Sequence, residues 1–185
     1  MNIKRVWLII PEVIFPYIVL LAVSNIFLVT KSRFFEMIME RIFNDNALYL
    51  VAVVLLFALF ALILSILCIV ISLYKKWDSL SLAKTAVIVK LLQAPAYIII
   101  YILGALCCIT IFTFAFTFAF VLIDCIVLFM SGLLTVSSII NAYRQKLISK
   151  KDAIIFGALQ FVFVADVVYA IIYFKKLSEL KTLGV

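Results

Sequence analysis

The chain has 185 residues, of which 69% are hydrophobic and 14% are charged, and its mean hydropathy is +1.36. Soluble domains are about half apolar and about a quarter charged, so this composition excludes a soluble globular protein. Too few residues lie outside the apolar runs to build a separate soluble domain. The sequence therefore predicts an all-α, polytopic transmembrane helical bundle that forms one domain over residues 1–185.

The net charge of +7 and the absence of histidine exclude further classes of protein. Lys and Arg lie in short segments beside apolar runs, which favours the lipid bilayer and anionic lipid headgroups as partners over nucleic acid. Without histidine the chain lacks the usual imidazole metal sites and Ser/His/Asp or Cys/His catalysis, and its four cysteines form no CxxC pair. We therefore expect no enzyme activity, no metal and no cofactor.

Residues 6–30 form the first apolar run and predict the first membrane span. A signal peptide is the alternative, because residues 22–24 (Ala-Val-Ser) resemble a cleavage site, but the length of the run favours a span. Pro11 and Pro16 lack an amide hydrogen and should bend the helix. Glu12 lies roughly 9 Å into the span, where its carboxylate either reaches back to the headgroups or faces the bundle.

Residues 31–74 contain two helices of opposite character. The segment 31–44 predicts an amphipathic helix that lies on the outer membrane surface. Its apolar residues share one helical face: Phe35, Ile38, Met39 and Ile42. Residues 47–74 predict the second span, which is apolar on almost every side and should therefore face much lipid.

The third predicted span covers residues 90–113 and carries a polar stripe. Spacings of three and four residues place these side chains on one helical face: Lys90, Gln93, Tyr97, Tyr101, Gly104 and Cys108. Residues 79–93 either form a separate interfacial helix or the first turns of this span, and Pro95 is compatible with both. Lys90 either extends to the headgroups or pairs with Glu12.

The fourth predicted span, residues 117–143, is the segment around which the bundle should be organised. One face is polar from end to end: Thr117, Asp124, Ser131, Thr135, Ser138 and Asn141. An ionisable residue in a span belongs against other helices or a watery cavity, so we place this helix at the centre. The two polar stripes should face each other in an antiparallel hairpin. Residues 111–120 alternate Phe with Thr or Ala and are interpreted as a turn, because a lone strand in lipid leaves backbone groups unpaired.

Residues 153–174 predict a fifth span, in which Gly157 permits close helix contact. Its small and polar face contains Ala158, Ala165, Asp166, Tyr169, Ala170 and Tyr173. The distribution of Lys and Arg predicts a protein of the cell membrane with a cytoplasmic N-terminus. Five spans leave a basic tail outside, and a re-entrant fifth segment that returns this tail to the cytoplasm is the alternative.

The buried charges supply the candidate site. The residues expected to bind a ligand or an ion are Asp124, Asp166, Tyr97, Tyr101, Ser131, Thr135, Lys90 and Glu12. Two carboxylates close together in an apolar interior do not both ionise easily, which suits the handling of protons or cations. The alternative is that each carboxylate only bonds a neighbouring hydroxyl group and fixes the helix register, with Asp166 close enough to the outer end to reach water.

Two stretches resemble small bacterial multi-pass membrane proteins of uncharacterised function: KLLQAPAYIIIYILG, Lys90 to Gly104, and SKKDAIIFGALQFVFVADVVYAII, Ser149 to Ile172. The resemblance covers about a third of the chain. It implies a five-helix inner-membrane protein and carries no activity and no site.

The sequence thus predicts an integral membrane protein that binds or transports a small molecule, an ion or a lipid through a polar site between its third, fourth and fifth spans. The alternative is a non-catalytic accessory or assembly subunit, with a membrane protein partner or a second copy of the chain packed against it. The bare second span would serve that role.

Overall fold

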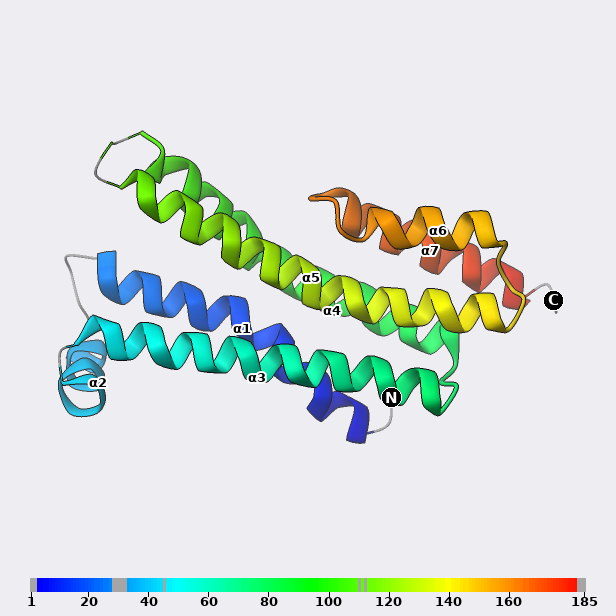
Figure 1. Ribbon diagram of the computed structural model, residues 1–185, viewed down its shortest axis with the longest axis horizontal. Coiled ribbons are helices and arrows are strands. Elements are labelled where there is room, and N and C mark those ends of the chain that lie inside the picture. Colours follow the sequence, from blue (N-terminus) through cyan, green and yellow to red (C-terminus); the bar gives the residue numbers. More distant parts are fainter. Residues whose placement is uncertain (1–2, 28–32, 45, 110, 112, 183–185) are drawn as a thin grey trace.

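The computed structural model describes residues 3–182 except 28–32, 45, 110 and 112 (Figure 1). These residues form seven helices and no strand: α1 (Ile3–Phe27), α2 (Arg33–Phe43), α3 (Ala47–Tyr74), α4 (Ser79–Cys107), α5 (Phe114–Arg144), α6 (Lys150–Leu159) and α7 (Ala165–Thr182). Four of them, α1, α3, α4 and α5, are long and apolar enough to cross a membrane. The all-α transmembrane bundle is therefore confirmed.

Three predicted spans correspond closely to single helices. The second span coincides with α3, and the fourth lies within α5. The first corresponds to α1, with residues 28–30 outside the described part of the chain. The third starts earlier than predicted, because α4 begins at Ser79 and continues through Pro95 without interruption. Residues 79–93 are therefore the first turns of that span.

The predicted fifth span is wrong as a single helix. α6 ends at Leu159, the chain turns over residues 160–164, and α7 then runs back beside α6 (Figure 1). Ten residues of α6 rise only about 15 Å, half of a hydrocarbon core. The hairpin therefore returns the chain to the end at which it entered, as the re-entrant alternative requires. Val164 has φ 65°, an unusual conformation for a β-branched residue that its sequence does not reveal.

The α4–α5 hairpin forms the centre of the bundle, as the facing polar stripes predict. It is the most extensive helix pair. Thr117 Oγ1 donates a hydrogen bond to the Gly104 carbonyl over 3.2 Å. A Cβ on Gly104 would lie 3.3 Å from the Cβ of Phe120, so glycine allows the two helices to approach closely.

The α1–α3 pair packs against this hairpin, and α2 crosses the end of α3 (Figure 1). Met39 and Phe43 of α2 are buried while Glu36 and Glu40 are exposed, so α2 is amphipathic, but Ile42, which was assigned to its apolar face, is 68% exposed. Asn46 caps α3, accepting a hydrogen bond from the backbone N–H of Leu48 over 2.9 Å.

Candidate functional site

The polar stripe of α5 faces the interior. Half of the apolar segment of α5 is buried inside the bundle, the largest share among the four spanning helices. Five of the six stripe residues are buried: Asp124, Ser131, Thr135, Ser138 and Asn141. The stripe divides into two regions with different partners, one near the middle of the bundle and one at its basic end.

In the first region, α1 is joined to α4 through a backbone carbonyl that a proline leaves free. Pro16 has no N–H, so the carbonyl of Glu12, four residues earlier, lacks its helical donor. Gln93 Nε2 of α4 donates to this carbonyl over 2.8 Å. The sequence predicts a bend at Pro16 but gave no reason to assign Gln93 as the donor that satisfies it.

The Glu12 side chain faces the bundle and does not extend to the headgroups. It is only 2% exposed, and Ser65 of α3 donates to its Oε2 over 2.9 Å. Its other oxygen, Oε1, has no hydrogen-bond partner in the described part of the chain. Ser65 is one of two serines in a mainly apolar helix, and this was the available signal for the contact.

Lys90 of α4 pairs with Asp166 in the first turn of α7. The Lys90 ammonium lies 2.7 Å from Asp166 Oδ2 and 3.2 Å from Ser131 Oγ, to which it also donates. Lys90 is fully buried and Asp166 is 4% exposed. Lys90 therefore does not extend to the headgroups, and Asp166 does not reach water. Glu12 lies within electrostatic range of Lys90 without forming an ion pair with it.

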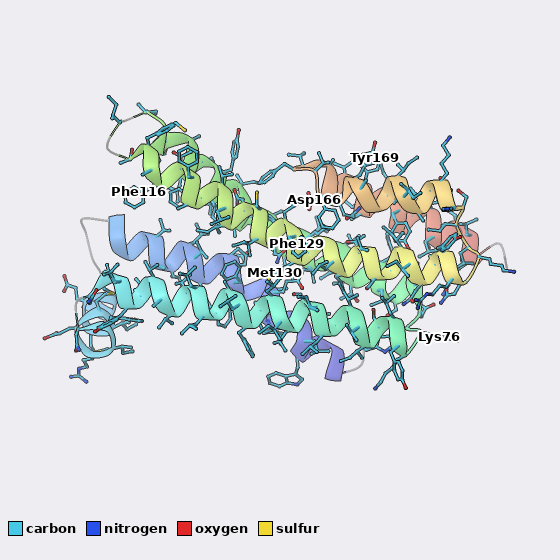
Figure 2. The ribbon with its side chains drawn as sticks, in the orientation of Figure 1. Lys76, Phe116, Phe129, Met130, Asp166 and Tyr169 are labelled. Atoms are coloured by element: carbon cyan, nitrogen blue, oxygen red, sulfur yellow. The ribbon has the colours of Figure 1, made fainter. Side chains whose placement is uncertain are left out.

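Asp124 and Tyr97 complete the region. Asp124 is 3% exposed, and its Oδ1 has no hydrogen-bond partner among the described residues. The Tyr97 hydroxyl group lies close to Ser131 without a well-formed hydrogen bond. That hydroxyl lies within electrostatic range of Asp124, Asp166 and Glu12. We refer to these residues together as the polar cluster: Glu12, Lys90, Gln93, Tyr97, Asp124, Ser131 and Asp166. Figure 2 shows Asp166 where the hairpin reaches the middle of the bundle.

Two predicted site residues lie outside the polar cluster. Tyr101 is 65% exposed, whereas Ile100 just before it is fully buried. The buried face of α4 is centred on Gln93, Ile100 and Gly104, and Tyr101 lies at its edge, so sharing a side of the helix with Lys90 does not bury it. Thr135 is buried, but its hydroxyl donates within α5 to the Ser131 carbonyl over 3.5 Å.

The polar cluster contains more acceptors than donors. The described residues include five buried side-chain N or O atoms without a hydrogen-bond partner, and all five are oxygens. Four belong to the polar cluster: Glu12 Oε1, Gln93 Oε1, Tyr97 OH and Asp124 Oδ1. Two carboxyl groups, those of Asp166 and Glu12, lie within electrostatic range of the single Lys90 ammonium group. A buried carboxylate without a partner is costly, so the cluster favours an added proton, cation or water.

The carboxyl groups do not converge on one point. Over the described residues, no group of three or more His, Cys, Asp or Glu side chains could hold a metal ion. A proton or a monovalent cation, which carries less charge and needs fewer anionic ligands, suits this arrangement better than a divalent metal.

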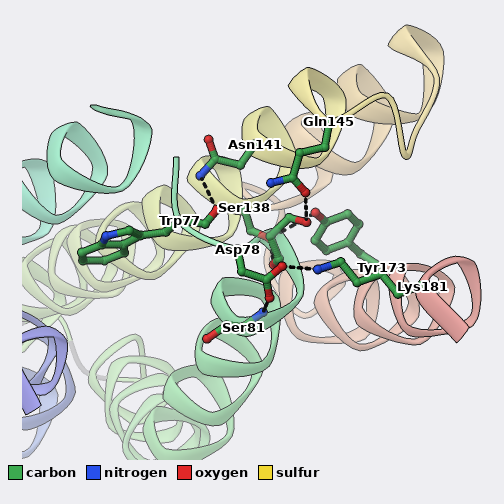
Figure 3. A network of polar contacts seen from close by, with 9 residues as sticks. Trp77, Asp78, Ser81, Ser138, Asn141, Gln145, Tyr173 and Lys181 are labelled. Carbon is green, nitrogen blue, oxygen red and sulfur yellow. Dashed lines mark hydrogen bonds and ion pairs between the residues drawn. The ribbon is translucent and has the colours of Figure 1, made fainter. Parts of the chain in front are cut away.

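The second region of the α5 stripe is a network at the basic end, drawn in Figure 3. Ser138 Oγ donates to the Ser79 carbonyl over 2.7 Å and lies 3.1 Å from the Tyr173 hydroxyl. Asn141 Nδ2 lies 3.2 Å from the carbonyls of Ser72 and Trp77. These contacts bond α5 to the α3–α4 turn and to α7, and they satisfy the polar groups involved. This region therefore anchors the helices.

The architecture defines the class of protein: an integral membrane protein built as an all-α bundle, with four membrane-spanning helices and a helical hairpin. Comparisons of the chain with protein-family models, with curated proteins and with solved structures find no match. The inference of function therefore rests on the geometry of the polar cluster.

Proposed function

We propose that this integral membrane protein binds a proton or a small monovalent cation in the polar cluster and carries it across the membrane. The observation that supports this function is the surplus of buried acceptors: Glu12 Oε1, Gln93 Oε1 and Asp124 Oδ1 have no hydrogen-bond partner in the described part of the chain. Ligands of this class supply the missing positive charge without a rearrangement of the bundle.

The charges of the polar cluster favour the same ligand class. Lys90 is already neutralised by Asp166 at 2.7 Å, so the carboxyl groups of Glu12 and Asp124 have no ion-pair partner among the described residues. Electrostatic interactions are strong where water is excluded, so a proton or cation held by either carboxyl group lowers the free energy of the whole cluster. A site that binds an anion would need the opposite balance of charges, with at least as many basic groups as carboxyl groups.

A flux assay tests transport. Vesicles that contain the purified protein and a trapped pH-sensitive dye receive an inside-negative potassium diffusion potential. We expect faster acidification than in empty vesicles, and a loss of about tenfold or more in Glu12→Gln or Asp124→Asn. Glu40→Gln, which makes the same change at an exposed carboxyl group on α2, should have no effect.

A binding assay covers the metal cations. A ligand that binds only the folded state raises its stability, so sodium or lithium chloride should raise Tm relative to choline chloride. Asp124→Asn should abolish this shift and Glu40→Gln should retain it. Flux equal to that of empty vesicles, together with a Tm that no cation changes, would contradict the proposal.

A second candidate function is a non-catalytic accessory or assembly subunit. The two hydrogen bonds from Lys90 to Asp166 and Ser131 support it, because such contacts also fix helix packing. The exposed apolar surface of α3, which includes Leu55, Leu59 and Ile63, would then face a membrane protein partner or a second copy. Copurification in a mild detergent distinguishes the two functions, since only the accessory subunit requires a stoichiometric partner.

The end of the bundle where α1 begins is proposed to lie in the cytoplasm of a cell membrane. Only Lys31, Arg33 and Arg41 lie between α1 and α3, and no Lys or Arg lies between α4 and α5. The hairpin places the basic end of α7 with the remaining Lys and Arg residues, which supports the positive-inside orientation. In a background without native cysteines, Lys181→Cys should be labelled only from the cytoplasm and Glu40→Cys only from outside.

A further inference from the structure

An apolar groove of about 220 Å³ lies between α5 and α6, outside the polar cluster. Ile140 and Tyr143 of α5 form one wall, and Ile154 and Gly157 of α6 form the other. It ends at Lys150, the first residue of α6. From Gly157 to Lys150 the groove follows about 10 Å of helix, so it is elongated along the bundle axis.

The glycine in this groove keeps space open. A Cβ added to Gly157 would meet no atom within 4 Å, so this glycine is not needed for helix contact, contrary to the prediction. Gly132 is the opposite case, because its Cβ would lie 3.0 Å from the ring of Phe161. Gly157 therefore widens the apolar floor of the groove at its inner end.

The mouth of the groove is positively charged. Lys150 lines the groove there, is exposed, and forms no ion pair with a described residue. The nearest carboxylate in the sequence, Asp152, is already paired with Lys176 at 3.0 Å. The groove thus combines an apolar channel with the unpaired ammonium group of Lys150 at one end.

From this combination we infer that the groove is a binding site for an anionic phospholipid. One acyl chain lies along α5 and α6 between Ile140 and Gly157, and the phosphate contacts Lys150. Charge complementarity assigns the occupant, because a zwitterionic lipid fills the apolar part equally well but gains little from the unpaired Lys150.

A second groove in the same chain provides an internal comparison. It lies between α1 and α4, has a volume of about 380 Å³ and is lined by Ile10, Ile14, Ile88 and neighbouring residues, with no Lys or Arg. Lipid chains that pack there have no reason to prefer a negative headgroup. A comparison of the two grooves therefore distinguishes binding of a specific lipid from the general lipid contacts of any membrane protein.

The test is native mass spectrometry of the full chain in detergent with equimolar phosphatidylglycerol and phosphatidylcholine. We expect phosphatidylglycerol to be retained at least about fivefold more than phosphatidylcholine, and Lys150→Gln to reduce this preference about fivefold. Gly157→Phe, which fills the groove, should remove the retained phosphatidylglycerol. Gly157→Leu is a smaller substitution for the same purpose, and circular dichroism verifies the fold of each variant.

Two control variants decide the interpretation. Lys84→Gln removes an exposed cation near the same end of the bundle, and Ile88→Phe fills the uncharged groove. Both should retain phosphatidylglycerol as the wild type does. The inference fails if Lys84→Gln and Lys150→Gln have equal effects, if the two lipids are retained equally, or if folded Gly157→Phe and Gly157→Leu variants still hold the lipid.

Discussion

The two ends of the α6–α7 hairpin are each joined by an ion pair, but the pairs lie in opposite surroundings. At the tip, Lys90 and Asp166 are 2.7 Å apart, and their side chains are 0% and 5% exposed. At the base, Lys176 and Asp152 are 3.0 Å apart, with exposures of 41% and 35%. Water solvates the charges at the base whether or not they pair, whereas each charge at the tip depends on its partner. Burial therefore decides which pair holds the hairpin.

The two ends of the hairpin also differ in whether their polar groups are hydrogen-bonded. Near the base, the Ser138 and Tyr173 hydroxyl groups lie within hydrogen-bonding distance of each other. Near the tip, Gln160 Oε1 and Tyr97 OH are buried without a partner among the described residues. An anchor needs satisfied polar groups, and a binding site needs groups that a ligand can still satisfy. The tip is therefore the end that belongs to the proposed function.

The largest expected effect comes from removing one partner at the tip. Lys90→Met leaves Asp166 buried without its cation and should destabilise the protein by about 3–5 kcal/mol. The double variant Lys90→Met/Asp166→Leu replaces both charges by apolar groups and should recover most of that loss. Thermal unfolding in detergent, followed by circular dichroism, measures both. If Lys90→Met unfolds at the wild-type temperature, the pair is solvated and the contrast with the base is lost.

A smaller loss is expected from the anchoring network at the base. Ser138→Ala removes the donor to the Ser79 carbonyl and the neighbour of the Tyr173 hydroxyl, which should cost about 1–3 kcal/mol. Ser137→Ala is the matched control, because Ser137 is equally buried but donates only to the Leu134 carbonyl of its own helix. Equal Tm values for the two variants would show that the network does not anchor the hairpin.

Much of this architecture follows from residue periodicity. The three-residue spacing of Lys90 and Gln93 on α4, and the seven-residue spacings of Asp124 from Thr117 and Ser131 on α5, place these side chains inside, because a polar residue that faces lipid is costly. The same argument predicts the α4–α5 hairpin. Periodicity cannot identify the partner of each group, so Lys90 was assigned either to the headgroups or to Glu12, and its contact with Asp166 depends on the unpredicted hairpin.

The hairpin itself leaves little trace in the sequence. Residues 160–164 read Gln-Phe-Val-Phe-Val, without the glycine or proline that usually marks a turn. The turn is stabilised by tertiary contacts: Phe161 stacks against Phe129 at 5.9 Å, and Phe163 meets Tyr97 edge-on at 6.3 Å. These contacts come from α5 and α4, so a reading of the local sequence finds only a continuous apolar run.

Two glycines allow the packing at the tip of the hairpin to be compared with the packing at the groove. Alanine is favoured over glycine in a helix by about 0.8–1 kcal/mol, so Gly157→Ala, with empty space around its Cβ, should raise stability by up to that amount. Gly132→Ala places a Cβ 3.0 Å from Phe161 and 3.3 Å from the Gln160 carbonyl, so steric strain should cancel or reverse this gain by about 1 kcal/mol. Unfolding of both variants under the same conditions measures the difference, and a stabilised Gly132→Ala would show that the tip is loosely packed.

The smallest effect is expected at the exposed ion pair. Hydrogen bonds from Lys176 and then Ser149 hold the pKa of Asp152 below the usual value of an aspartate. A lowered carboxyl pKa contributes stability that is present above the usual aspartate pKa and is lost as the pH falls through the lowered value. Asp152→Asn should therefore reduce stability by at most about 0.5 kcal/mol at pH 7, and the difference from the wild type should vanish only in strong acid, below about pH 4. Thermal unfolding of both proteins from pH 3 to pH 8 measures it. A loss of stability as large as that of Lys90→Met, or a difference that disappears already near pH 6, would mean that the Lys176–Asp152 ion pair is desolvated. Burial would then not explain the difference between the two ion pairs.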